Sequence, residues 1–120
     1  MESDAVVCEA CQPDAEKVEV GKLDQFLLEN NSWRLSSEMD TEMLEKKYSV
    51  KNFAEAQEFA KVVGDFAEKQ GHHPRILLEY GSVTVNWWSH KIHGIHAKDL
   101  TLAAATDQLF KENFEWAADI

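Results

Sequence analysis

Long apolar runs are missing from this chain, and so is any surplus of positive charge. No stretch approaches the about 20 consecutive apolar residues of a membrane-spanning helix. Lysine and arginine number 12 against 22 aspartates and glutamates, which gives a formal net charge of -10. Phosphate backbones and anionic membrane surfaces repel such a chain, so we expect no direct contact with nucleic acid or membrane. The acidic first residues do not resemble a secretory signal, which predicts a cytoplasmic protein.

Cysteine is also scarce, because Cys8 and Cys11 are the only two in the sequence. A structural zinc site usually needs four ligands, and a second cysteine pair is missing. A thioredoxin-like redox site would need a βαβ context, which the sequence pattern does not show. We therefore interpret this C-x-x-C as two thiols in a flexible N-terminal arm, residues 1–14. A metal shared between subunits, or a redox pair, are the alternatives.

Three stretches have the apolar spacing of amphipathic helices. We predict these helices at residues 17–29, 53–70 and 99–114. The second is the clearest, because Asn52 can cap its start with Glu55 three positions on. Gly71 suits the left-handed conformation that ends a helix. In the third helix, Leu102 and Asn113 are expected to share one face.

Two other stretches alternate with a period of two, which is typical of strands. Residues 33–50 predict a hairpin with a long polar turn, SEMDTE. In the second hairpin, alternating apolar residues flank Gly81 and Ser82, which we expect to form a two-residue turn. The sequence therefore predicts an α+β fold, a four-stranded antiparallel sheet with helices packed on one face. We expect residues 15–116 to form this single domain.

Three histidines are predicted to meet at the open end of the second hairpin. With a turn at Gly81-Ser82, the strand register places His73 opposite His90. Directly opposed residues in an antiparallel pair have Cα atoms about 4.5–5.5 Å apart. His72 is the neighbour of His73, so all three imidazoles are expected around one cleft.

Imidazole is the side chain whose pKa lies nearest neutrality, so it acts readily as an acid or a base. Several imidazoles around one cleft suit elimination of water, in which one group protonates the leaving hydroxyl and another accepts a proton. Asp99, at the start of the third predicted helix, and Glu68, one helical turn before His72, are placed to orient imidazoles.

A metal site built from His90, His93 and His96 is the alternative for this region. Their spacing of three residues would put them on one face of a helix. Gly94 and the preceding strand argue against a helix there, and a fourth ligand is not evident in the sequence. We therefore expect no metal in this cleft.

The same residues resemble the signature of the pterin-4a-carbinolamine dehydratases. That signature is an acidic residue, a His-His-Pro, an aromatic residue, a histidine and an aspartate, here Glu68, His72-His73-Pro74, Tyr80, His90 and Asp99. The resemblance covers about residues 15–110 and is greatest with bacterial-type members associated with phenylalanine hydroxylase. It implies a hydro-lyase that dehydrates 4a-hydroxytetrahydrobiopterin to quinonoid dihydropterin. The reaction recycles the pterin cofactor of aromatic amino acid hydroxylases.

The resemblance also implies roles for individual residues. His72, His73 and His90 would form the catalytic centre, with His72 and His90 exchanging protons with the 4a-hydroxyl and N5. His73 would mainly hold and orient the pterin. The substrate-binding residues would be Glu68, Pro74, Ser89, Lys91, Ile92 and Asp99. No metal and no bound cofactor are implied, because the pterin is the substrate.

Partners follow from the same resemblance. Family members are dimers or tetramers, so we expect a homodimer or homotetramer, with an aromatic amino acid hydroxylase as a functional partner. Some relatives have a second role in binding a transcription factor or in chaperone-like assembly. The alternative function is therefore a protein-binding dimerisation or assembly cofactor on the same fold. The three intact histidines favour catalysis.

Overall fold

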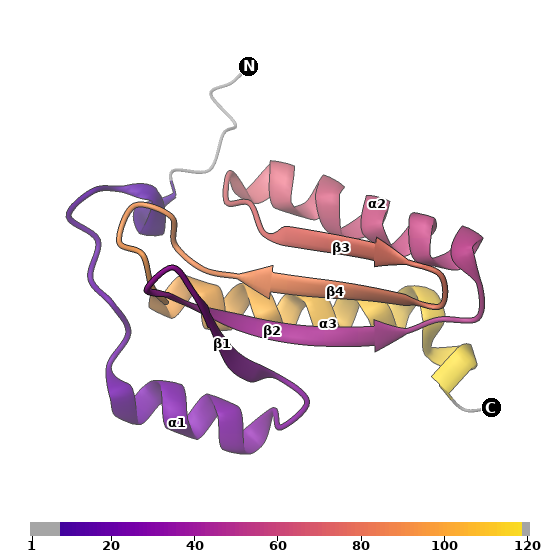
Figure 1. Cartoon of the computed structure of the whole chain (residues 1–120), viewed down its shortest axis with the longest axis horizontal. Helices are drawn as coiled ribbons and strands as arrows, with labels where there is room; N and C mark the ends of the chain where they lie inside the picture. The colour runs from indigo at the N-terminus through magenta and orange to yellow at the C-terminus, as the bar shows by residue number, and fades with distance from the viewer. Residues whose placement is uncertain (1–7, 119–120) are drawn as a thin grey trace.

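The structure, a computed structural model, describes residues 8–118. Four strands form one antiparallel sheet in the order β1-β2-β4-β3. The elements in chain order are the 3-10 turn η2 (Glu9–Cys11), α1 (Val20–Glu29), β1 (Arg34–Glu38), β2 (Thr41–Ser49), α2 (Phe53–Gln70), β3 (Arg75–Glu79), β4 (Ser82–Trp87) and α3 (Ala97–Ala118). Figure 1 shows α2 and α3 behind the sheet, which confirms the predicted α+β layer. Within residues 8–118, no helix is long and apolar enough to cross a membrane.

The core lies between the sheet and its two long helices. Phe59 on α2 packs edge-on against Tyr48 of β2, with ring centroids 4.9 Å apart. Phe110 and Phe114 of α3 complete this aromatic cluster. Trp87 of β4 is fully buried in the same core, where its ring meets that of Phe66 on α2 edge-on. Burying a large apolar side chain contributes about 1.5–3 kcal/mol to the free energy of unfolding. These buried side chains therefore hold the two long helices against the sheet.

Both predicted ends of α2 are confirmed. The Asn52 side chain accepts a hydrogen bond from the backbone N–H of Glu55 at 2.9 Å. Gly71 takes the left-handed conformation, with φ of 64°. This residue ends α2 and redirects the chain, so His72 lies directly at the end of the helix.

The other two helices differ from the prediction at their ends. α1 begins at Val20, later than predicted, since the backbone N–H of Val18 donates to the Ile95 carbonyl at 2.7 Å. That bond keeps the preceding residues extended. α3 runs from Ala97 to Ala118, and Asn113 is exposed while its neighbour Phe114 is buried. The prediction for Asn113 was therefore wrong, because the helix turns its aromatic residues inward.

The first hairpin has a short turn where a long one was predicted. Glu38 pairs with Thr41, so only Met39 and Asp40 lie between β1 and β2. Both residues have positive φ, 49° and 64°. A turn of this kind matches the twist of paired strands, which explains why the polar SEMDTE segment mostly continues the strands.

The second hairpin turns one residue earlier than predicted. Glu79 pairs with Ser82, so the two turn residues are Tyr80 and Gly81. Gly81 carries the positive φ, 80°. Every partner is therefore displaced by two positions, and the predicted pairing of His73 with His90 was wrong. A displacement of two keeps each side chain on its predicted face, so the histidines still approach one another.

The N-terminal residues within the described range do not extend away from the domain. Cys8 is 7% exposed and Ala10 is fully buried. Cys8 and Cys11 form a disulfide, and η2 packs near the start of α3. Residues 8–11 of the predicted flexible arm are thus part of the packed structure, while residues 1–7 lie outside the described residues.

Candidate functional site

Three histidines from separate segments line one small pocket. His72 and His73 follow α2, and His90 lies in the loop between β4 and α3. The pocket has a volume of about 190 Å³ and is lined by Cys11, His72, His73, His90 and Lys91. The structure thus brings together the imidazoles that were predicted to meet at the open end of the second hairpin.

His72 is the buried member of the group, with 1% of its surface exposed. Its Nε2 lies 2.7 Å from Oδ1 of Asp99. Its Nδ1 lies 3.2 Å from the sulfur of Cys8 and 3.3 Å from that of Cys11. Trp87 stacks on the ring, with centroids 5.9 Å apart. The packing therefore fixes this imidazole in one orientation.

Asp99 lies beneath His72 and is held by three hydrogen bonds. It lies in the first turn of α3, where the helix dipole favours a negative charge, and it is fully buried. Its Oδ2 accepts hydrogen bonds from Ser89 Oγ at 2.7 Å and from the backbone N–H of His96 at 2.9 Å. Together with Oδ1, which accepts from His72 Nε2, these bonds satisfy a buried carboxylate. As in other carboxylate–imidazole pairs, the bond sets which ring nitrogen of His72 carries the proton.

His73 and His90 are the exposed members of the group. Nε2–H of His90 donates to the backbone carbonyl of His73 at 2.9 Å. The ring of His90 stacks on Trp88, with centroids 4.4 Å apart. Its Nδ1 has no hydrogen-bond partner among the described residues, so that nitrogen is available to a ligand. His73 Nε2 lies 2.7 Å from a carboxylate oxygen of Glu68, and both side chains are largely exposed.

The remaining predicted site residues fall into three positions. Lys91 lines the pocket itself. Ser89 is fully buried beneath it, and its hydroxyl is used by Asp99. Pro74 and Ile92 are adjacent in sequence to lining residues but are not among those that line the pocket. The predicted substrate contacts of these residues stay predictions.

His93 and His96 do not join the pocket. His93 has a positive φ of 53° in the loop, and its Nδ1 approaches the Thr41 hydroxyl at 3.5 Å. His96 Nδ1 accepts from the backbone N–H of Lys98 at 2.9 Å. Within the described chain, His90, His93 and His96 form no group whose nitrogens could share a metal ion. The alternative metal site at these three residues is therefore wrong.

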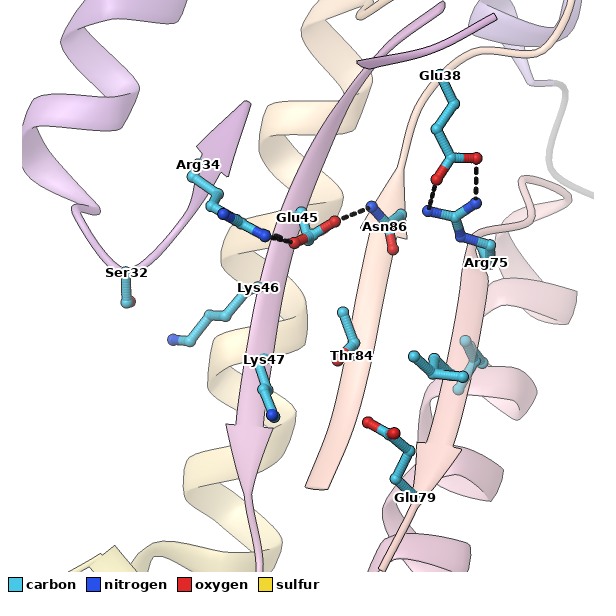
Figure 2. A pocket seen from close by; sticks show the side chains of 12 residues that line it. Ser32, Arg34, Glu38, Glu45, Lys46, Lys47, Arg75, Glu79, Thr84 and Asn86 are labelled. Carbon is cyan, nitrogen blue, oxygen red and sulfur yellow. Dashed lines mark hydrogen bonds and ion pairs between the residues drawn. The ribbon is translucent and has the colours of Figure 1, made fainter. Parts of the chain in front are cut away.

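A larger hollow lies elsewhere, on the face of the sheet that α2 and α3 leave open. Its volume is about 800 Å³, and no histidine or cysteine lines it. Figure 2 shows that four of its charged groups form two pairs, Arg34 with Glu45 and Arg75 with Glu38. Arg34 and Asn86 hold the carboxylate of Glu45, while Arg75 holds that of Glu38 through two hydrogen bonds.

These pairings shift the pKa values on the open face away from neutrality. Hydrogen bonds from Asn86 and then Arg34 lower the pKa of Glu45. The hydrogen bond from Arg75 lowers the pKa of Glu38 and raises the pKa of the Arg75 guanidinium in return. Groups held in one charge state at neutral pH are poor proton-transfer catalysts. The histidine pocket is therefore the better candidate site, although it is smaller.

Sequence reasoning missed two features of the site. Cys11 lines the pocket, yet no period or motif links it to the histidines. The bond from the Ser89 hydroxyl to Asp99 was also missed, because the two residues come from separate segments. The position of Asp99 at a predicted helix start, by contrast, did predict that it would orient an imidazole, and it lies 2.7 Å from His72 Nε2.

Comparisons with known proteins bear on the family of this chain. A sequence model of the family described as pterin 4 alpha carbinolamine dehydratase matches residues 16–109. A relative from Hahella chejuensis is 45% identical over 103 residues, covering 86% of this chain and 92% of its own length. One from Vibrio vulnificus is 44% identical over 108 residues, covering 90% and 98%. Both are provisionally named pterin-4-alpha-carbinolamine dehydratases. This chain belongs to that family.

Members of the pterin-4a-carbinolamine dehydratase family are hydro-lyases, so the predicted enzyme class is confirmed. Two solved structures share the fold. A transcriptional coactivator/pterin dehydratase from Brucella melitensis has a TM-score of 0.68 at 21% identity, covering 78% of this chain and 98% of its own. A pterin dehydratase-like protein, identified as a RuBisCO assembly factor in the alpha-carboxysome, has a TM-score of 0.54 at 23% identity, covering 65% and 88%.

Proposed function

We propose that this protein removes water from pterin-4a-carbinolamine in the pocket formed by His72, His73 and His90. The observation that carries the proposal is the convergence of three imidazoles on one cavity of about 190 Å³. The reaction breaks the bond from C4a to the hydroxyl and removes the proton from N5, giving quinonoid dihydropterin and water. It needs one group to protonate the hydroxyl and another to accept the N5 proton, and imidazoles near neutral pH can do both.

The free nitrogens suggest how the roles divide. His90 offers Nδ1, because its Nε2–H is held by the His73 carbonyl. His72 is the proposed second proton-transfer group, with Asp99 accepting from Nε2–H so that Nδ1 is the basic nitrogen. That nitrogen lies beside Cys11, which also lines the pocket. Exposed His73, held by Glu68, is placed to bind and orient the pterin.

The direct test is a stopped-flow assay on chemically generated 4a-hydroxytetrahydropterin. Wild type is expected to accelerate the dehydration over buffer, and His90→Ala to lose about 10²–10⁴-fold of that acceleration. His93→Asn is the matched control, because it removes an imidazole outside the pocket and asparagine tolerates a positive φ. A wild type no faster than buffer would contradict the proposal and favour the assembly role. Activity is expected to survive EDTA.

We propose that the protein recycles the pterin cofactor of an aromatic amino acid hydroxylase in the cytoplasm. The resemblance to bacterial-type members associated with phenylalanine hydroxylase supports this role. The check is a reconstituted reaction with a purified hydroxylase and a dihydropterin reductase. Adding the protein is expected to raise sustained turnover when the pterin is limiting. Turnover that does not respond would separate the dehydratase from this pathway.

We also propose a homodimer or homotetramer. In the strand order β1-β2-β4-β3, the edge strands β1 and β3 present unpaired backbone groups. On β3, Leu77 is 50% exposed and Leu78 is 36% exposed. Exposed apolar edge strands favour pairing with another chain. Sedimentation velocity is expected to give a species of two or four chains, and a single chain at micromolar concentration would contradict this.

A further inference from the structure

The cysteine pair lies against a catalytic candidate. The sulfurs of Cys8 and Cys11 and Nδ1 of His72 all lie within 4.8 Å of one another. Cys8 and His72 are buried, and Cys11 is half-buried. Ala10, between the cysteines, is fully buried, so the segment is held in place by packing. These three side chains come from segments far apart in sequence. Packing therefore holds two sulfurs and one imidazole nitrogen together as possible metal ligands.

The other side of His72 has the arrangement of a metal-binding histidine. Metal-ligating histidines usually donate their second N–H to a carboxylate, which fixes the tautomer and raises the basicity of the ligating nitrogen. Here Asp99 lies 2.7 Å from Nε2. Nδ1 then carries a lone pair directed at the two sulfurs. Disulfide sulfurs have no proton to donate, so this lone pair gains no conventional hydrogen bond from them.

We propose that reduced Cys8 and Cys11, together with Nδ1 of His72, bind one Zn²⁺ ion. Zinc is bound by thiolate and imidazole ligands, and sites with three protein ligands keep a fourth position for water or another ligand. Tetrahedral zinc places sulfur and nitrogen ligands about 3.5 Å apart, given usual bond lengths of about 2.3 and 2.0 Å. The observed sulfur–nitrogen distances are 3.2 and 3.3 Å. Small movements therefore suffice once the sulfurs are separate.

The site changes with the redox state of the cysteines. A dithiol reductant supplies two electrons and two protons, breaks the bond between the sulfurs and leaves two thiols. Zinc then displaces both thiol protons and binds the thiolates. The oxidised form, with its sulfurs bonded to each other, has no thiolate to offer. The fourth position lies next to the pocket, because Cys11 and His72 both line it.

The cysteines lie outside the part of the chain that the family model matches, which is residues 16–109. The site thus joins one histidine of the family signature to a segment beyond the matched region. Resting on the proposed function, one consequence follows for catalysis. Zinc on Nδ1 of His72 would take the nitrogen that we assign to proton transfer, so zinc would inhibit the reduced enzyme.

The test is a zinc titration of the full chain in competition with a chromophoric chelator. Wild type reduced with a phosphine is expected to bind one Zn²⁺ per chain, and the oxidised protein to bind none. Cys8→Ser is expected to lose this binding, while His93→Asn, which changes a histidine outside the cluster, keeps it. Co²⁺ in place of Zn²⁺ is expected to give thiolate charge-transfer absorption only in reduced protein with both cysteines.

Asp99→Asn distinguishes the full site from chelation by the thiols alone. Loss of such a carboxylate partner typically weakens metal binding about 10–100-fold, so this loss is expected although both thiols remain. Unchanged affinity would overturn the role of His72. Equal zinc affinity in reduced wild type, oxidised wild type and Cys8→Ser would overturn the site as a whole. Both readouts measure metal binding, so they stand even if the protein proves not to be a dehydratase.

Discussion

Two aspartates on α3 accept similar numbers of hydrogen bonds but have different roles. Asp99, at the start of the helix, accepts hydrogen bonds from His72 Nε2, Ser89 Oγ and the backbone N–H of His96. Asp107 lies further along the same helix and also accepts three bonds. Its donors are Trp33 Nε1 at 3.1 Å, Lys46 Nζ at 2.7 Å and Tyr48 Oη at 2.6 Å.

The difference lies in the donors. At Asp99 one donor is the imidazole of His72, which lines the small pocket. At Asp107 the donors are an indole, an ammonium and a phenol, and none of them lines that pocket. Burial of the Tyr48 ring, followed by its hydrogen bond to Asp107, raises the pKa of Tyr48 far above its ordinary value. A carboxylate with three hydrogen-bond donors therefore marks a candidate functional site only where one of those donors lines a pocket.

Removing the structural carboxylate is expected to have the largest effect on stability. Asp107→Ala leaves the phenol of Tyr48, the ammonium of Lys46 and the indole N–H of Trp33 without their acceptor. Partly buried donors that lose a charged partner cost several kcal/mol, so we expect a loss of about 2–4 kcal/mol in unfolding free energy. Urea denaturation measures it. The dehydratase rate per folded molecule is expected to stay at the wild-type value. A large loss of rate would contradict the distinction between a structural Asp107 and a functional Asp99.

Changing the carboxylate beneath His72 is expected to affect both stability and rate. In Asp99→Asn, the amide group must turn its NH₂ toward one of three donors, which costs about 1–3 kcal/mol of stability. If the NH₂ faces His72, the ring must move its proton from Nε2 to Nδ1. We expect the rate of dehydration to fall about tenfold, equivalent to about 1.4 kcal/mol in barrier height. A variant that is destabilised but fully active would place Asp99 with Asp107 as a structural residue.

The smallest effect concerns alkaline pH. In the unfolded chain Tyr48 ionises near pH 10, whereas in the folded chain its raised pKa keeps it protonated. The folded state thus binds more protons above about pH 10, so stability falls as pH rises there. Tyr48→Phe removes this contribution and is expected to cost about 1 kcal/mol at neutral pH.

Denaturation of both proteins across neutral and alkaline pH checks this. The wild type is expected to lose stability more steeply than Tyr48→Phe above about pH 10. Parallel curves for the two proteins would mean that Tyr48 ionises equally easily in both states. That result would contradict the buried hydrogen bond to Asp107.

Local signals in the sequence predicted much of this fold. Asn52 and Gly71 mark the two ends of α2, and both act through bonds within a few residues. Alternation predicted the second hairpin, and its open end brings the histidines together although the hairpin turns one residue earlier than expected. The position of a two-residue turn depends on which residue takes positive φ, and Gly81 fits either position.

Contacts between distant segments were beyond sequence reasoning. The cysteine segment against His72 depends on packing of residues far apart in the chain, and no periodicity encodes it. The same is true of Asp107, whose donors come from β2 and from the residue before β1. Composition showed only that these polar groups exist, whereas burial decides that they must pair.

The central claim is that the histidine pocket, and not the larger open-face hollow, binds the pterin. NMR of uniformly ¹⁵N-labelled protein titrated with a non-reactive dihydropterin tests it directly. We expect the ring nitrogen signals of His73 and His90 to shift in a saturable way, while the amide signals of Glu45 and Thr84 on the open face stay in place. Saturable shifts confined to Glu45 and Thr84, with unmoved histidine rings, would contradict the account.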